Sequence, residues 1–183
     1  MSSQPHRRPP RGFTLAELLI IVALIAILAA IVLPNVLRSQ ISANEASAVA
    51  DIAIINRAEV SYQTAYPTLG FAGSLETLGP NGSSDQCQAP ASSHACLIPG
   101  GLAEATSAEH ARNGYWFAAS ATGKDANGVV SAYVAGAAAA VYNKTGVRDF
   151  CSQEDAVVRF RVPKSSSAPA KSAPECAAME VLR

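Results

Sequence analysis

Residues 13–33 read FTLAELLIIVALIAILAAIVL, and this stretch decides the fold. Glu17 is its only charged residue. A helix of 21 residues spans roughly 30 Å at ~1.5 Å per residue, which is about the thickness of the hydrocarbon core of a bilayer. The sequence therefore predicts a transmembrane helix over residues 13–34.

The flanks of this helix indicate its orientation. Residues 1–12, MSSQPHRRPPRG, contain three arginines, one histidine and no acidic residue, and Arg38 is the only charge near the other end. Because basic flanks stay in the cytoplasm, the N-terminus is predicted to be cytoplasmic and the chain after Pro34 to lie outside. A secretory signal would have a shorter apolar region and would be removed whole. Here the sharper boundary lies between Gly12 and Phe13.

The string RGFTLAELLI, residues 11–20, resembles the leader junction of type IV prepilins and type II secretion pseudopilins. Pro34 and Asn35 extend the resemblance. It implies a leader peptide over residues 1–12, cleavage after Gly12 by a prepilin peptidase on the cytoplasmic side, and N-methylation of Phe13. It also implies a precursor in the bacterial inner membrane with a periplasmic C-terminal domain, followed by an extracellular pilus or a periplasmic pseudopilus.

The resemblance covers about the first third of the chain closely and the rest only in architecture. Ala16 and Ala26 occupy positions where this family often has a larger aliphatic residue and a glycine. An alanine at position 26 makes local melting of the helix harder than a glycine would.

Glu17 is a carboxylate inside an apolar helix, which costs several kcal/mol unless the charge is paired. No Lys or Arg lies between Gly12 and Arg38, but cleavage would create an amine at Phe13, one turn or ~6 Å along the axis from Glu17. A neighbouring helix displaced by about one turn would bring its amine to Glu17, so Phe13 and Glu17 are predicted to guide assembly. Pairing within one chain and snorkelling of Glu17 to the interface are the alternatives.

Pro34 is predicted to kink this helix without ending it. Residues 35–66 continue as its amphipathic half, because apolar residues recur at intervals of three or four, and Pro67 ends it. The apolar positions are Ile41, Ala48, Ile52, Ile55, Tyr62 and Tyr66, with Glu45, Asp51, Arg57 and Glu59 interspersed.

The remaining chain predicts three further regions. Residues 67–113 are rich in Pro, Gly, Ser and Asn and form an irregular connecting region with a short helix near residues 102–112. Residues 114–162 form an antiparallel sheet of about four strands, at 115–121, 129–141, 147–151 and 156–162, with a hairpin turn at Asn127-Gly128. Residues 163–183 form a flexible strap tethered by a disulfide. The predicted fold class is α+β, with the sheet packed on the second half of the helix.

Four cysteines follow the apolar helix, which is consistent with two disulfides in an oxidising compartment. Three connectivities are possible. The local one, Cys87 with Cys96 and Cys151 with Cys176, closes the shortest loops at the lowest entropic cost and is favoured. In pilins a comparable C-terminal disulfide loop is an exposed, variable surface, so the resemblance implies a contact surface there, although the loop equally fits a simple tether for the terminus.

Charge and motifs exclude several functions. Removing residues 1–12 takes 14 basic residues down to 11 against 14 acidic ones, a net charge of 11 − 14 = −3, which gives no support to nucleic-acid binding. No catalytic motif or cofactor site is recognisable, so no enzyme and no cofactor are predicted. His94, His110, Cys87 and Cys96 match no zinc spacing, and no metal site is predicted.

The function predicted from these features is a structural pilin that polymerises through its hydrophobic N-terminal helix for attachment or motility. A type II secretion pseudopilin, a minor tip pilin or adhesin, and an anchored protein that never assembles are the alternatives. The implied partners are other copies or related pilins, the prepilin peptidase and methylase, the assembly machinery, and membrane lipid before assembly.

Overall fold

The computed structural model describes residues 13–82, 87 and 89–182, with only the backbone for residues 31–34. The predicted leader, including Gly12, lies outside the described residues. The chain divides into two units, Met1–Arg38 and Ser39–Arg183, and the second contains the sheet and all residues of the two apolar cores.

Helix α1 (Leu15–Ala65) passes through Pro34. It ends before Pro67, because a proline disfavours helical backbone at the preceding residue. Within the described part of the chain, no single helix qualifies by length and composition as a membrane span. The segments Leu15–Ala30 and Asn35–Ala65 qualify only together, as a broken pair. The membrane span and the kink at Pro34 therefore remain predictions.

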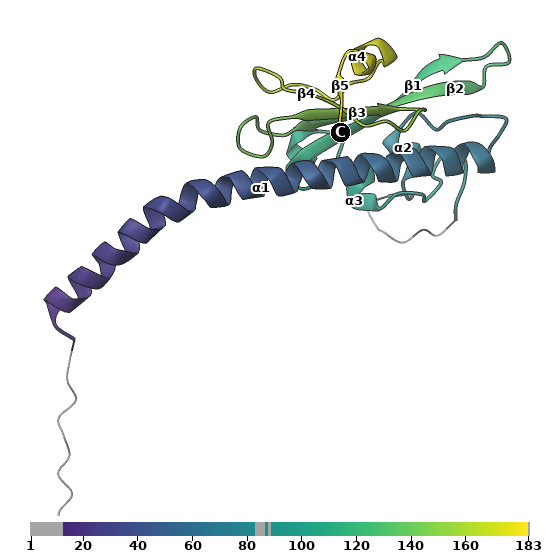
Figure 1. Ribbon diagram of the computed structural model, residues 1–183. Coiled ribbons are helices and arrows are strands. Elements are labelled where there is room, and N and C mark those ends of the chain that lie inside the picture. The colour runs from purple at the N-terminus through teal and green to yellow at the C-terminus, as the bar shows by residue number, and fades with distance from the viewer. Residues whose placement is uncertain (1–12, 83–86, 88, 183) are drawn as a thin grey trace, which may run out of the picture. The chain divides into compact units, whose positions relative to one another are not determined.

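The sheet contains five antiparallel strands in chain order: β1 (Tyr115–Lys124), β2 (Val130–Ala139), β3 (Asp149–Gln153), β4 (Arg159–Arg161) and β5 (Glu180–Val181). Figure 1 shows this sheet lying along the second half of α1, with α4 (Ala173–Ala177) on its opposite face. The predicted α+β fold, a long helix packed on an antiparallel sheet, is confirmed.

The core lies between α1 and the inner face of the sheet. Alternate strand residues point to this face, and the period of α1 brings a matching apolar stripe against it. The bulkiest apolar side chains that are almost fully enclosed there are Ile52, Ile55, Tyr115, Phe117, Tyr133 and Phe150. These contacts join elements that are more than 50 residues apart in the chain.

The later strands differ from the predicted ones. The third strand begins at Asp149 rather than at Val147, because the amides of Val147 and Arg148 donate to Glu45 of α1 instead of to a strand. The fourth strand is shortened to Arg159–Arg161. The fifth, β5, was not predicted, because two residues cannot show a strand period.

The connecting region and the strap are more ordered than predicted. The expected helix near residues 102–112 is divided into α3 (Gly100–Ala103) and a 3-10 turn, η1 (Ala108–His110), and α2 (Leu75–Leu78) precedes them. In α2 the Ser74 side chain accepts a hydrogen bond from the Thr77 amide at 3.1 Å, which caps the helix. The strap contributes α4 and β5.

Candidate assembly and processing site

The start of α1 lies beside the predicted cleavage point. Thr14 Oγ1 accepts a hydrogen bond from the Glu17 amide at 3.2 Å, and the Thr14 carbonyl accepts one from the Leu18 amide at 3.2 Å. Thr14 therefore occupies the N-cap position and Glu17 the third helical position. Sequence reasoning missed this cap, although Thr-x-x-Glu before an apolar run is a recognised signal for it.

Phe13 and Glu17 are both exposed in the isolated chain. Phe13 precedes the helix and is 75% exposed. Among the described residues, the Glu17 carboxylate makes no hydrogen bond or ion pair, and its place in the first turn favours a negative charge because the helix dipole is positive there. The geometry thus leaves the carboxylate available to a partner.

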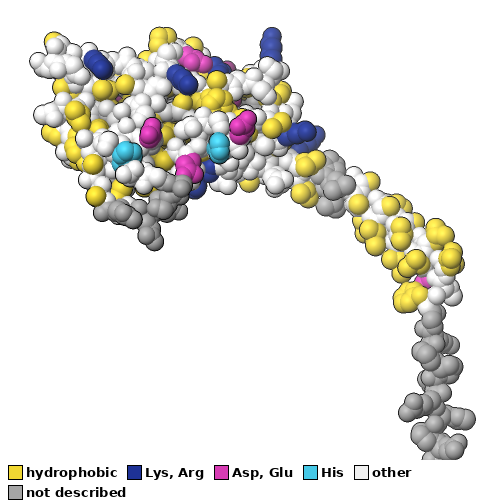
Figure 2. Space-filling view, turned by 180° about the vertical axis from the view of Figure 1, so that it is seen from behind, with side chains coloured by type: hydrophobic (Ala, Val, Ile, Leu, Met, Phe, Trp, Pro, Cys, Tyr) yellow, Lys and Arg dark blue, Asp and Glu magenta, His cyan; other side chains and the backbone are white. Residues whose placement is uncertain are grey.

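The first unit also exposes a continuous apolar surface. Figure 2 shows hydrophobic side chains gathered along the N-terminal part of α1. Between positions 15 and 28 the large apolar side chains are 41–79% exposed, on every side of the helix. They are Leu15, Leu18, Leu19, Ile20, Ile21, Val22, Leu24, Ile25, Ile27 and Leu28. A surface of this kind marks a site that contacts lipid or other helices.

The acidic residues of the second half of α1 fasten the sheet domain. Glu45 accepts the amides of Val147 and Arg148 at 2.9 and 3.1 Å and pairs with the Arg148 guanidinium at 2.7 Å. Asp51 pairs with Arg112 at 3.2 Å. Burial raises the pKa of Asp51, and the nearby Arg112 opposes that shift. The helical pattern did not reveal that these carboxylates are buried.

Glu59 is the most enclosed of the carboxylates on α1. Its side chain is fully buried and accepts the amides of Ala72 and Gly73 at 2.7 and 3.2 Å. No cation pairs with it among the described residues. Burial raises the pKa of Glu59 to about 7, and the two amide hydrogen bonds only partly offset this effect.

The four cysteines form two local disulfides, Cys87–Cys96 and Cys151–Cys176. This is the connectivity expected from the loop lengths. The two bonds differ in environment, because Cys87 is exposed whereas Cys151 and Cys176 are completely buried.

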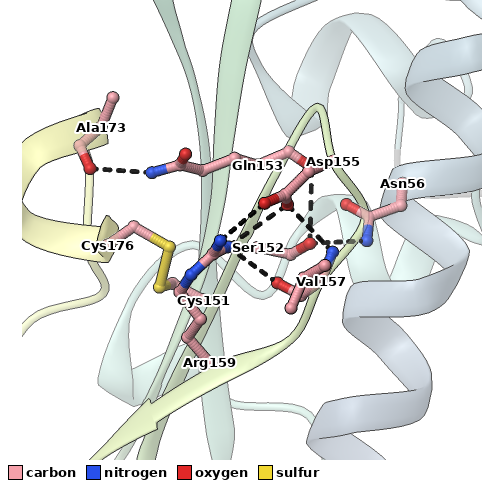
Figure 3. A network of polar contacts seen from close by, with 9 residues as sticks. All are labelled: Asn56, Cys151, Ser152, Gln153, Asp155, Val157, Arg159, Ala173 and Cys176. Atoms are coloured by element: carbon pink, nitrogen blue, oxygen red, sulfur yellow. Dashed lines mark hydrogen bonds and ion pairs between the residues drawn. A yellow bond between two sulfur atoms is a disulfide. The ribbon is translucent and has the colours of Figure 1, made fainter. Parts of the chain in front are cut away.

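The strap is held on the outer face of the sheet by more than its disulfide. Figure 3 shows Cys151 and Gln153 of β3 directed to the strap, where Gln153 donates to the Ala173 carbonyl at 2.7 Å. Ser152 lies between them in sequence and accepts from Asn56 of α1 at 2.9 Å on the opposite face. Strand β3 thus ties helix, sheet and strap together.

A close approach and an ion-pair network complete the attachment of the strap. A side chain at Gly136 of β2 would collide with the Ala170 carbonyl oxygen, so the strap needs a glycine there. Arg161 pairs with Asp149 at 3.0 Å and with Glu175 at 2.7 Å. These contacts hold the predicted strap on the sheet in addition to its disulfide.

A long helix on an antiparallel sheet, with a capped helix start and an exposed apolar surface, defines a pilin-like protein. The prokaryotic N-terminal methylation motif matches residues 7–33. The type IV wide pilus major component PilA4 of Thermus thermophilus is 34% identical over 122 residues, covering 61% of this chain and 82% of that protein. No solved structure matched the chain.

These similarities identify the family. The chain belongs to the type IV pilins, a family of structural proteins. The motif match spans the predicted junction at Phe13, part of the predicted leader before it and the apolar part of α1 after it.

Proposed function

We propose that this protein is a structural subunit of a type IV pilus and that it polymerises through its N-terminal helix after the leader is removed. The observation that carries this proposal is the apolar surface of residues 15–28, which is exposed on every side. It includes one carboxylate, Glu17, that has no partner among the described residues. Only an environment of lipid or of other apolar helices would cover that surface.

Processing and assembly are coupled in this proposal. Cleavage after Gly12 would release a positively charged amine at Phe13, which a prepilin peptidase would also methylate. Thr14 caps the helix immediately afterwards, so the cut would leave the helix start intact. The amine of one copy would then pair with Glu17 of a neighbour displaced by about one turn, which fixes the register between subunits.

The proposed route begins in the bacterial inner membrane. The basic leader would stay in the cytoplasm and the disulfide-bonded domain would fold in the periplasm, where an oxidising environment permits both disulfides. Assembly machinery would then move the subunit from the membrane into a filament that serves attachment or motility.

The location of the subunit can be tested directly. Filaments sheared from the cell surface are expected to yield this chain as an abundant component that begins at methylated Phe13, measured by mass spectrometry. Recovery from membranes alone would contradict a role as a major pilin. It would instead favour a periplasmic pseudopilus or a protein that is only anchored.

The pairing can be tested by replacing Glu17 with glutamine, which removes the charge and keeps the shape. Leader cleavage is expected to continue, while filament yield falls by more than about tenfold, because breaking a buried charge pair weakens binding at each subunit contact. Yield is measured by quantifying sheared filaments, and cleavage from the N-terminal peptide.

Glu104→Gln supplies the matched control. Glu104 is exposed in the second unit and its side chain makes no ion pair within the described part of the chain, so this variant is expected to assemble normally. A Glu17→Gln variant with the same filament yield as Glu104→Gln would refute the pairing.

A further inference from the structure

An apolar groove lies at the β4–β5 side of the sheet domain. Its volume is 640 Å³, several times that of an about 150 Å³ cavity that can hold benzene. The residues that line it are Arg148, Phe160, Glu180, Val181 and Leu182. Val181 is 50% exposed, although it lies beside other apolar groups.

The charges around this groove are unequal. The guanidinium of Arg148 is paired with Glu45 of α1 at 2.7 Å and also lies 5.5 Å from the ring centre of Phe160. Glu180 is exposed and makes no ion pair or side-chain hydrogen bond among the described residues. The groove therefore presents an apolar surface with one uncompensated negative charge.

A complementary surface is present on α1. Leu37 is 61% exposed, and Arg38 beside it is exposed without an ion pair within the described part of the chain. At about 100° per residue, Ile41 lies between Leu37 and Arg38 around the helix, so an apolar stripe is bordered by a positive charge. Ile41 is itself partly exposed.

We infer that the groove receives the Leu37–Arg38 turn of α1 from a second copy of this chain, with Leu37 against Phe160 and Val181 and with Arg38 paired to Glu180. This inference rests on the proposed function, because a filament brings the helices of many copies together. Helix α1 of the same copy already pairs its Glu45 with Arg148. The element that enters the groove is therefore a second helix. Opposite charges at its edge select one orientation of that element.

Charge reversal tests the ion pair. Glu180→Lys and Arg38→Glu are each expected to lower filament yield by about fivefold, and the double variant is expected to restore it to within about twofold of the parent. Glu154→Lys is the matched control, because Glu154 is exposed in the turn between β3 and β4 and does not line the groove. Unchanged yield in both single variants, or no recovery in the double variant, would overturn the pair.

Cross-linking tests the identity of the occupant. Leu37→Cys and Val181→Cys are expressed as separate copies in one cell, and sheared filaments are oxidised gently. A disulfide between positions 37 and 181 of different copies is expected by peptide mass spectrometry. The control pairs Leu37→Cys with Leu69→Cys, because Leu69 is exposed but does not line the groove.

The outcomes separate this inference from the proposed function. Filaments that form without a link between positions 37 and 181 of different copies overturn the inference and leave the pilus function intact. Failure of the parent protein to form any filament would instead contradict the proposed function, and the inference with it.

Discussion

Glu59 shows how a single buried carboxylate connects three parts of the fold. It extends from α1 to the amides of Ala72 and Gly73, and the same short segment continues to β2 through a hydrogen bond from the Phe71 amide to the Val130 carbonyl. Its charge has no cation partner among the described residues. The titratable groups that interact electrostatically with Glu59 are Tyr62 and Tyr133, and burial raises the pKa of both tyrosines.

This environment predicts a pH dependence of stability. The pKa of Glu59 is about 7 in the folded chain against an ordinary value of 4.5, so between these values the folded state binds more protons than the unfolded state. The stability that protonated Glu59 adds to the folded state is therefore fully present below about pH 4.5 and is lost as the pH rises through about 7. The free energy of unfolding falls by roughly 3 kcal/mol at most over this range. Thermal unfolding of the detergent-solubilised protein at pH 5 and pH 8 measures it.

Glu59→Gln isolates the effect of that carboxylate. The variant is expected to show a smaller fall in melting temperature between pH 5 and pH 8 than the parent, because glutamine does not ionise. Glu76→Gln, at an exposed position in α2, serves as the control and should behave like the parent. Equal pH dependence in the parent and the Glu59 variant would contradict the assignment.

The two disulfides hold their loops in different environments. Cys87 is exposed, whereas Cys151 and Cys176 are fully buried beside Met179. A thiolate must reach a sulfur atom to break the bond, so mild reduction is expected to open Cys87–Cys96 first. Timed alkylation followed by mass spectrometry measures the order, and earlier labelling of Cys151 or Cys176 would contradict it.

Local sequence signals predicted some elements well and others poorly, for physical reasons. Pro67 ends α1 and Asn127-Gly128 marks the β1–β2 hairpin, because both act through the conformation of the nearby backbone. The start of β3 depends instead on Glu45, whose contacts with Val147 and Arg148 join residues about a hundred positions apart. No local pattern reports such a contact.

The difference between local signals and contacts of distant residues also applies to the candidate site. The junction at Phe13 and the lone charge of Glu17 are visible in the sequence because they are a linear motif within an apolar run. The groove beside Glu180 is formed by strands and a C-terminal segment that meet only after folding. The sequence alone therefore could not predict this groove.

The chain consists of an N-terminal unit whose apolar surface is exposed and a second unit that contains its own core. Every residue of the two apolar cores lies at position 48 or later, and the ion pair between Glu45 and Arg148 also belongs to the second unit. The chain 39–183 is therefore expected to fold alone as a water-soluble monomer with both disulfides. Without residues 13–38 it is expected to form no filaments.

A shorter fragment tests whether the carboxylates of α1 fasten the domain. Beginning the chain at Ile52 removes Glu45 and Asp51, which leaves Arg148 and Arg112 without their partners. The side chains of Arg112 and Arg148 are each 36% exposed, so each lost pair costs about 1 kcal/mol, and the truncation also removes the buried Ala48. Fragment 52–183 is therefore expected to unfold at a lower temperature than 39–183. Size-exclusion chromatography and thermal circular dichroism compare the two. Aggregation of 39–183 would contradict independent folding of the domain, and equal stability of both fragments would show that the carboxylates of α1 do not fasten it.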